Sequence, residues 1–162
     1  MPPRKQNPER RWSMYRQLHD DVSRLLEEEG LYFTFNKKDT DEGCHRSYDT
    51  NITGRFICRN KKCGSPGWSS KMVAITIRMY PGARYNARVY HQSCKSCNCL
   101  SRPLLNDTYA ERIAYRIKKW NGIEVETPHY SGNSELPHNE DLCEGCKAGH
   151  CKRRNNGFIG YY

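Results

Sequence analysis

Three close pairs of cysteines are the residues of this 162-residue sequence whose type and spacing could do chemistry. The cysteines concerned are Cys58 and Cys63, Cys94 and Cys97, Cys143 and Cys146, and then Cys151. A spacing of two to four residues lets a tight turn direct two sulfurs at one ion, and structural zinc takes four such ligands in a closed tetrahedron. The spacing therefore predicts structural zinc.

The number of ligands predicts two zinc ions. One site would use Cys58, Cys63, Cys94 and Cys97. The other would use His138, Cys143, Cys146 and Cys151, all within the stretch HNEDLCEGCKAGHC. Three alternatives stay open: the pairs could be crossed between the sites, Cys99 could replace Cys97, and His150 could replace His138.

Catalytic alternatives to structural zinc have little support in the sequence. A redox centre of the thioredoxin type needs one CxxC where a strand meets a helix, whereas several pairs lie in loops here. A catalytic zinc keeps one position open and has an acid or base nearby. Glu144 could serve, but four ligands are available for each site. We therefore predict no enzymatic activity and no small-molecule substrate.

The composition favours metal over disulfides in a reducing compartment. The first residues, MPPRKQNPERRW, are charged, and no apolar run approaches the ~20 residues of a membrane span. We therefore expect an intracellular protein, cytoplasmic or nuclear, with no transmembrane segment, in which clustered cysteines bind metal. Only 36% of the residues are apolar, which is lean for a core that must stabilise itself without metal.

The elements that must position these cysteines follow from hydrophobic periodicity. Apolar residues between Glu9 and Glu29 recur every three or four positions, which predicts an amphipathic helix ended by Gly30. KMVAITIRMY and RYNARVYH alternate around a PGA turn and predict an antiparallel hairpin with one buried and one polar face. DTYAERIAYRIKKWNG predicts a second helix.

These elements predict an α+β fold. It would combine a small zinc-stabilised antiparallel sheet, made of the hairpin and short strands, with one helix in the C-terminal half and an N-terminal amphipathic helix. The expected organisation is an N-terminal helical arm over residues 1–43, a three-CxxC zinc-binding domain over 44–151, and a basic tail over 152–162.

Charge is distributed unevenly along the chain and indicates a partner. Residues 51–120 hold fourteen Lys and Arg against only Asp107 and Glu111. The side chains predicted to be exposed are Arg78, Tyr80, Arg84, Arg88 and Tyr90 on the hairpin, and Arg112, Arg116, Lys118 and Lys119 on the second helix. Interleaved Arg and Tyr suit phosphate contact and base stacking, which predicts RNA binding. The alternative is that an exposed face must be polar in any case.

Several motifs together resemble a known family. They are GRFIC-x4-C, W-S-S-K-x-V-A-I-T-I-R, Y-N-A-R-V-Y-x-Q-x-C-x-x-C and LCEGCKAGHC. In order and spacing they resemble the three-CxxC-type zinc finger domain, with the fungal versions most similar, although the first pair here is spaced x4. The family also includes receptor-transporting proteins and RNA-binding zygote arrest proteins. The resemblance implies that the seven cysteines above, with His138, bind zinc. It also leaves a second function open, that of a protein-interaction adaptor or trafficking chaperone.

Overall fold

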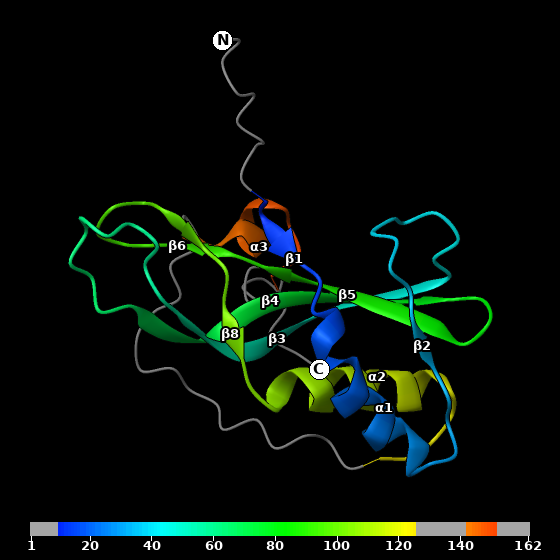
Figure 1. The fold of residues 1–162 in the computed structure, drawn as a ribbon. Helices are drawn as coiled ribbons and strands as arrows, with labels where there is room; N and C mark the ends of the chain where they lie inside the picture. The colour runs from blue at the N-terminus through cyan, green and yellow to red at the C-terminus, as the bar shows by residue number, and fades with distance from the viewer. Residues whose placement is uncertain (1–9, 126–141, 152–162) are drawn as a thin grey trace, which may run out of the picture.

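A computed structural model describes residues 10–125 and 142–151; residues 1–9, 126–141 and 152–162 lie outside the described part of the chain. The fold is a curled six-stranded sheet with three α-helices (Figure 1). The strands of this sheet are β1 (Trp12–Ser13), β2 (Thr34–Phe35), β3 (Arg46–Phe56), β4 (Trp68–Tyr80), β5 (Arg84–Tyr90) and β8 (Leu104–Leu105). A small second sheet pairs β6 (Gln92–Ser93) with β7 (Leu100–Ser101).

The strand order of the main sheet is β1-β5-β4-β3-β8, and the short β2 pairs in parallel with β5. The long antiparallel pair β4 and β5 is the hairpin predicted from the alternating sequence, and that prediction is confirmed. Strand β3 is longer than the short strands expected beside the hairpin, because it pairs with β4 along nearly its whole length. The α+β class is confirmed as well.

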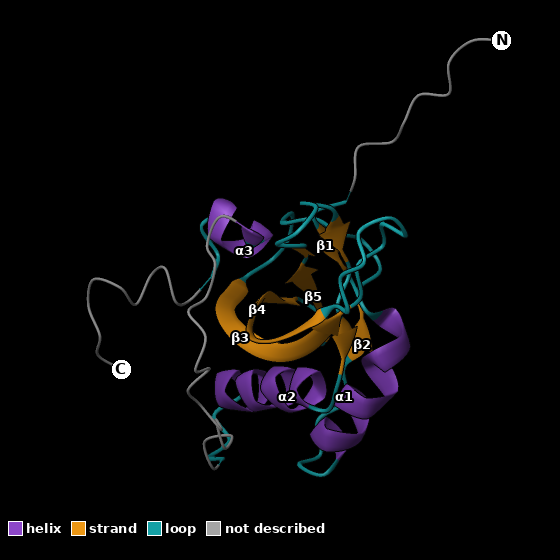
Figure 2. Cartoon of the chain, turned by 90° about the vertical axis from the view of Figure 1, so that its left-hand side faces the viewer, coloured by secondary structure: helices purple, strands orange, loops and turns teal. Residues whose placement is uncertain are grey.

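Helices cover one face of the sheet. They are the 3-10 turn η1 (Arg16–Leu18), α1 (His19–Glu27) and α2 (Thr108–Trp120). Figure 2 shows α1 and α2 beneath the curved strands. The main core lies between these layers and is built from Val22, Leu26, Val73, Ile75, Ile77, Ile113 and Ile117, all fully buried. Burying such side chains is the dominant favourable term in folding.

The opposite face of the sheet is covered too. The helix α3 (Glu144–Lys147) lies over it in Figure 1, and a second cluster there joins Ala74, Tyr90 and Trp12 of the edge strand β1 to the cysteines around α3. Beyond them, residues 36–45 run over the far end of β4 and β5. The sheet therefore has no fully solvated face, unlike the one-sided hairpin predicted from the sequence.

The N-terminal segment differs from the predicted helix over 9–29. Helical structure starts only at Arg16, because Trp12 pairs with Tyr90 as an edge strand; tertiary pairing overrides local helical periodicity here. Gly30 has a φ of 71°, as expected for a residue just beyond a helix end. The segment predicted to be an arm packs through α1 into the same core as the strands.

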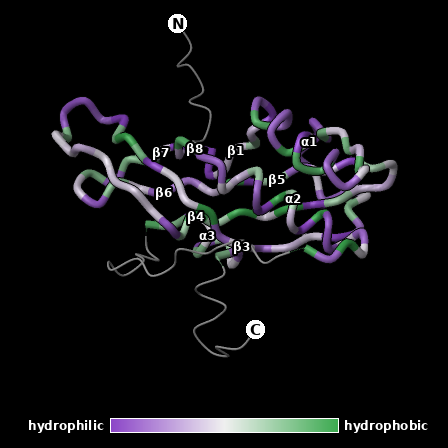
Figure 3. Tube along the Cα trace, turned by 90° about the horizontal axis from the view of Figure 1, so that it is seen from below, coloured by the Kyte–Doolittle hydropathy of each residue, from purple (hydrophilic) through white to green (hydrophobic). Residues whose placement is uncertain are grey.

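The described helices include none that is both long and apolar enough to cross a membrane. Figure 3 shows hydrophobic residues along the central strands, whereas the loops at the end of the molecule near β6 and β7 are mostly hydrophilic.

Candidate metal centres

The sulfurs of Cys58, Cys63, Cys94 and Cys97 lie together, all within 4.8 Å of one another. The contact from Cys58 to Cys97 measures 3.4 Å and that from Cys63 to Cys94 measures 3.8 Å. Tetrahedral zinc with Zn–S bonds of about 2.3 Å requires sulfurs about 3.8 Å apart. This four-cysteine cluster therefore fits a zinc ion, and its members are the two cysteine pairs that were predicted to share one site. Cys99 is not a member of it.

Backbone amides favour the ionised form of one half of this cluster. Burial alone would raise the pKa of Cys94, but amide hydrogen bonds from Cys97 and Ser96 lower that pKa to about 6. For Cys58 the Asn60 amide acts in the same direction, yet desolvation and the neighbouring thiols raise its pKa to about 12. Zinc binds thiolates, so the lowered pKa of Cys94 favours the form of this thiol that binds the ion.

The four-cysteine cluster sits between two loops, residues 57–67 and 94–99, which we call the cysteine tip. The tip projects from the sheet at the left of Figure 1. Its base is braced by Phe56, which stacks on Trp68 with ring centroids 4.9 Å apart, and Trp68 Nε1 donates to Gln92 Oε1 at 3.1 Å. Gly67 has a φ of 88°, and a Cβ there would lie 2.3 Å from the Phe56 carbonyl oxygen, so the turn requires glycine.

Cys143, Cys146 and Cys151 form a second group, also within 4.8 Å of one another. All three are at most 1% exposed, whereas among the tip cysteines only Cys94 is buried to that degree. Asn51 Nδ2 donates to Cys151 Sγ at 3.6 Å, and the Cys146 amide donates to Cys143 Sγ at 3.4 Å. Hydrogen bonding with Cys151 and burial raise the pKa of Cys143, so a bound cation would be needed to hold three thiolates here.

The one-turn helix α3 presses this three-cysteine cluster against the sheet. Cys143 forms an isolated bridge with Gln92, and the Glu144 amide donates to the His91 carbonyl at 3.1 Å. A Cβ on Gly145 would lie 2.3 Å from the Cβ of Ala74 on β4. Glycine at position 145 and alanine at position 74 therefore permit the close approach of helix and strand.

A fourth ligand for this cluster does not come from the described residues. His150, the rival to His138, is engaged elsewhere: its Nδ1 lies 3.0 Å from Asp49 Oδ2, and its ring stacks on Tyr90. It is not part of the sulfur group. His138 lies outside the described residues, so its role as fourth ligand stays a prediction. Three buried cysteines with CxxC spacing nevertheless suit zinc.

The basic face predicted from the sequence is largely buried, and the prediction that Arg78 is exposed is wrong. Arg78 is 1% exposed. Its Nη2 lies 2.7 Å from Asp39, its Nη1 lies 3.1 Å from Asp41, and its Nε donates to Asn86 at 2.8 Å. The loop that carries Asp39 and Asp41 folds over the strands. Arg78 is therefore held in buried ion pairs and is not available for the predicted RNA contact.

The other hairpin candidates are covered in the same way. Tyr80 and Tyr90 are each 2% exposed, so neither presents a free ring. Arg88 is partly buried; its Nε pairs with Asp39 at 2.5 Å, and its guanidinium lies over Trp12. Arg84 at the end of the hairpin is exposed as predicted.

The helical candidates lie on α2, in the layer beneath the sheet, so the predicted residues do not share one face. Lys119 is exposed, Arg112 and Lys118 are partly buried, and the guanidinium of Arg116 lies 3.4 Å from the Tyr48 ring centroid. RNA contact by the accessible members remains a prediction that no structural observation tests.

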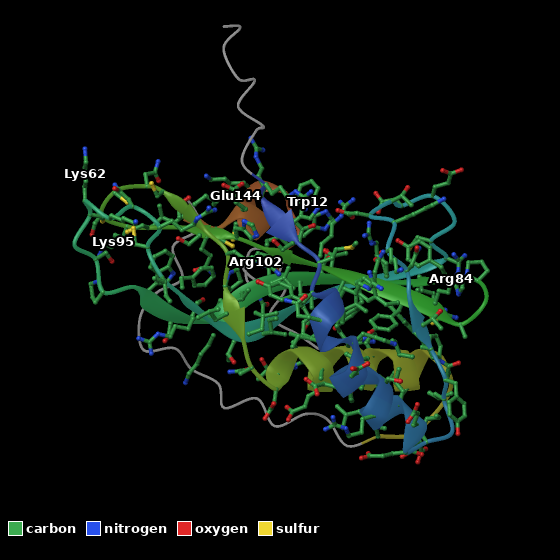
Figure 4. All side chains as sticks on the ribbon, viewed as in Figure 1. Trp12, Lys62, Arg84, Lys95, Arg102 and Glu144 are labelled. Carbon is green, nitrogen blue, oxygen red and sulfur yellow. The ribbon has the colours of Figure 1, made fainter. Side chains whose placement is uncertain are left out.

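Four basic residues were missed: Arg59, Lys61, Lys62 and Lys95, all exposed on the cysteine tip. The sequence did hold a signal, because residues between closely spaced zinc ligands must point away from the metal. Figure 4 shows Lys62 and Lys95 pointing outward from the tip, and Arg102 lies between them and Trp12 in this view.

Residues 51–149 match the Zn_ribbon_3CxxC family, which is described as a zinc-binding domain. The matched region includes both members of each of the three close cysteine pairs, and ends just before Cys151. No curated protein and no solved structure matches the chain significantly.

Proposed function

The chain belongs to the Zn_ribbon_3CxxC family of zinc-binding domains, and from that premise we propose that it is a structural-zinc module that binds single-stranded RNA through the cysteine tip. The two cysteine clusters fit two zinc ions. Each ion would hold loops that have little apolar surface of their own to bury, and would perform no reaction.

The observation that carries the RNA proposal is the charge of the tip. Residues 51–106 contain ten Lys and Arg and no Asp or Glu. Four of these cations are exposed on the two tip loops, whereas Arg78 on β4 and Arg88 on β5 pair with Asp39. An ordinary solvated surface mixes charges of both signs. A rigid cationic projection attracts a phosphate backbone and releases counterions when it binds one.

Zinc supports this function by fixing the spacing of the cations. The loop 57–67 carries Arg59, Lys61 and Lys62, and the loop 94–99 carries Lys95. Sulfurs from both loops meet in one cluster, so the metal holds the two loops side by side. Flexible loops would have to be ordered during binding, at a cost in conformational entropy. The three-CxxC family that the sequence resembles also includes zygote arrest proteins, which bind RNA, and this supports the same proposal.

A protein-interaction adaptor is the second candidate, favoured by two exposed apolar residues beside the tip. Ile57, directly after β3, is 59% exposed, and Leu104 on β8 is 57% exposed. Strand β8 pairs with the end of β3, so the two side chains lie near each other. Their area is small for a stable interface, which usually buries about 800 Å² on each partner, so RNA is the better-supported function.

The test is RNA binding by fluorescence anisotropy across a salt series. Lys62→Glu with Lys95→Glu changes one residue on each tip loop and should weaken binding to oligouridine at least about tenfold. It should also lower the slope of affinity against salt by roughly 1–2, because two counterion-releasing contacts are lost.

The matched control is Arg24→Glu with Arg46→Glu, which makes the same change in charge on α1 and at the start of β3. The control should bind nearly as tightly as the parent. A third pair, Arg84→Glu with Lys119→Glu, tests the exposed remainder of the face predicted from the sequence. If the parent binds no RNA at low salt, or the tip variant binds like the control, the RNA function is refuted. Ile57→Ser with Leu104→Ser would then test the adaptor.

A further inference from the structure

A groove beside β1 has the chemistry of an anion site and is not used by either metal centre. Its volume is about 900 Å³, within the range of roughly 300–1,000 Å³ that is usual for ligand sites. Its walls come from residues 10–16 and from the segment around β2, all outside the matched family region. The side chains that matter are Arg10, Arg11, Arg16, Lys37, Trp12 and Phe35.

The cations of the groove lack counter-charges. Within the described ranges, Arg10, Arg16 and Lys37 are exposed and make no ion pair, and Arg11 has only a long contact of 3.9 Å to Glu144. Three unpaired cations around one concavity repel one another. An anionic ligand would relieve that repulsion.

The acid in the groove wall is already neutralised. Asp39 Oδ1 lies 2.7 Å from Arg78 and 2.5 Å from Arg88, and its Oδ2 accepts a hydrogen bond from Trp12 Nε1 at 2.6 Å. Partial burial would raise the pKa of Asp39, but these donors hold the pKa below its usual value. The carboxylate therefore stays ionised. It pairs with Arg78 and Arg88 and does not neutralise the cations that line the groove.

Two aromatic rings provide an apolar wall between the cations. Trp12 is held in place by its bond to Asp39 and by an edge-on contact with Tyr90 at 6.2 Å. Phe35 packs against Tyr85 with ring centroids 5.7 Å apart. Rigid aromatic side chains among Arg and Lys are the usual platform for unstacked bases of a single strand.

The groove adjoins the cysteine tip through the backbone. The His91 amide donates to the Arg11 carbonyl at 2.9 Å, and Ser13 Oγ lies 2.7 Å from His91 Nε2. Cys94 follows His91 by three residues, a reach of at most about 10 Å. Burial, together with the charges of Arg102 and Arg59, lowers the pKa of His91 to about 4, although the charge of Glu144 acts in the opposite direction.

We propose that this groove receives the continuation of the RNA strand bound at the cysteine tip, with a base against Trp12 and Phe35 and phosphates at Arg10, Arg16 and Lys37. The inference rests on the proposed RNA function and deepens it. It assigns base contact to the groove, whose cations also bind phosphates, whereas the tip contacts the RNA backbone alone. The protein would then prefer strands that carry bases over a bare sugar-phosphate chain.

The test uses oligouridine of about ten nucleotides and an abasic oligomer of the same length. The parent should bind oligouridine at least about fivefold more tightly than the abasic strand, since stacking strengthens binding. Trp12→Ala should remove this preference while abasic binding stays unchanged. Phe35→Leu, which keeps apolar bulk, should reduce the preference and serves if Trp12→Ala lowers the melting temperature or zinc content.

Arg16→Glu with Lys37→Glu should weaken binding of both oligomers at least about fivefold, whereas Arg24→Glu with Arg46→Glu should not. If the groove variants bind both oligomers like the parent while the tip variant fails, the groove assignment is refuted and the RNA function stands. A parent that binds neither oligomer refutes both. A parent that binds both equally, with only the charge variants impaired, excludes base stacking and overturns the groove proposal.

Discussion

The two cysteine clusters have similar chemistry but opposite surroundings. The four-cysteine cluster projects between exposed basic loops, whereas the three-cysteine cluster is buried between α3 and the sheet. The first has backbone amides that lower the pKa of Cys94 and Cys97, while the Cys143 thiol has its pKa raised by hydrogen bonding with Cys151 and by burial.

This difference implies a division of labour. Metal at the buried cluster would stabilise the packing of α3 and β1 on their part of the sheet, because Ala74, Tyr90 and Trp12 pack around it. Metal at the tip would order only the loops that surround it. One cluster thus serves stability and the other serves the presentation of charge, and the following predictions test that division.

The largest effect is expected at the buried cluster. Cys146→Ser should remove one of two zinc ions and lower the free energy of unfolding by more than about 4 kcal/mol, because metal binding there is coupled to folding. Elemental analysis and urea unfolding provide the measurements. Loss of zinc without loss of stability would show that the buried metal does not support the sheet.

Gly145→Ala should come next. The added methyl would meet the Ala74 Cβ at 2.3 Å and push α3 away from β4, which should cost about 1–3 kcal/mol. Ala74→Gly in the same chain makes room and should restore part of the melting temperature. A double variant as unstable as Gly145→Ala alone would show that this contact does not seat the helix.

A smaller effect on stability is expected at the tip. Cys63→Ser should also remove one zinc ion but lower the free energy of unfolding by only about 1 kcal/mol, because no core side chain depends on it. Hydrogen exchange should rise in residues 57–67 and 94–99 alone. RNA affinity should fall as well, which separates the role of the tip from that of the buried cluster. Faster hydrogen exchange in β4 as well would contradict the proposal that the tip metal orders only its own loops.

The last prediction concerns the rates at which a chelator removes the two zinc ions. A chelator such as EDTA, added to the intact protein, should take one zinc ion quickly and the second much more slowly, because three of the four tip cysteines are partly exposed and the three buried ones require local opening. A colorimetric zinc indicator follows the two phases. A single phase would indicate equal access to both clusters.

Spacing predicted the cysteines that gather in each cluster, with crossed pairing left as an alternative, since a CxxC turn fixes two sulfurs whatever the rest of the chain does. Alternation predicted β4 and β5, and the stretch DTYAERIAYRIKKWNG predicted the helix α2. These features depend on interactions that are local in sequence.

What the sequence could not reveal was the second covering of the sheet. Thr76, Arg78 and Tyr80 alternate with the core residues in the manner of a solvated face, yet residues 36–45 and α3 lie over them. Nothing local distinguishes an Arg that meets water from one that meets Asp39 across 39 residues of chain. The prediction of a helix at Trp12 was wrong for the same reason. Trp12 pairs with Tyr90, which lies far along the sequence.

The way β1 and α1 join the sheet has a consequence for the order of folding. Tyr15 donates a hydrogen bond to the Pro103 carbonyl, 88 residues further on, and Asn51 meets Cys151 at a separation of 100 residues. A nine-residue helix such as α1 is marginal by itself in water. During synthesis, Val22 and Leu26 must therefore wait for β4, β5 and α2 before they can be buried. Contacts so distant in sequence make folding slow and expose the nascent N-terminal segment to aggregation until the last cysteines have emerged.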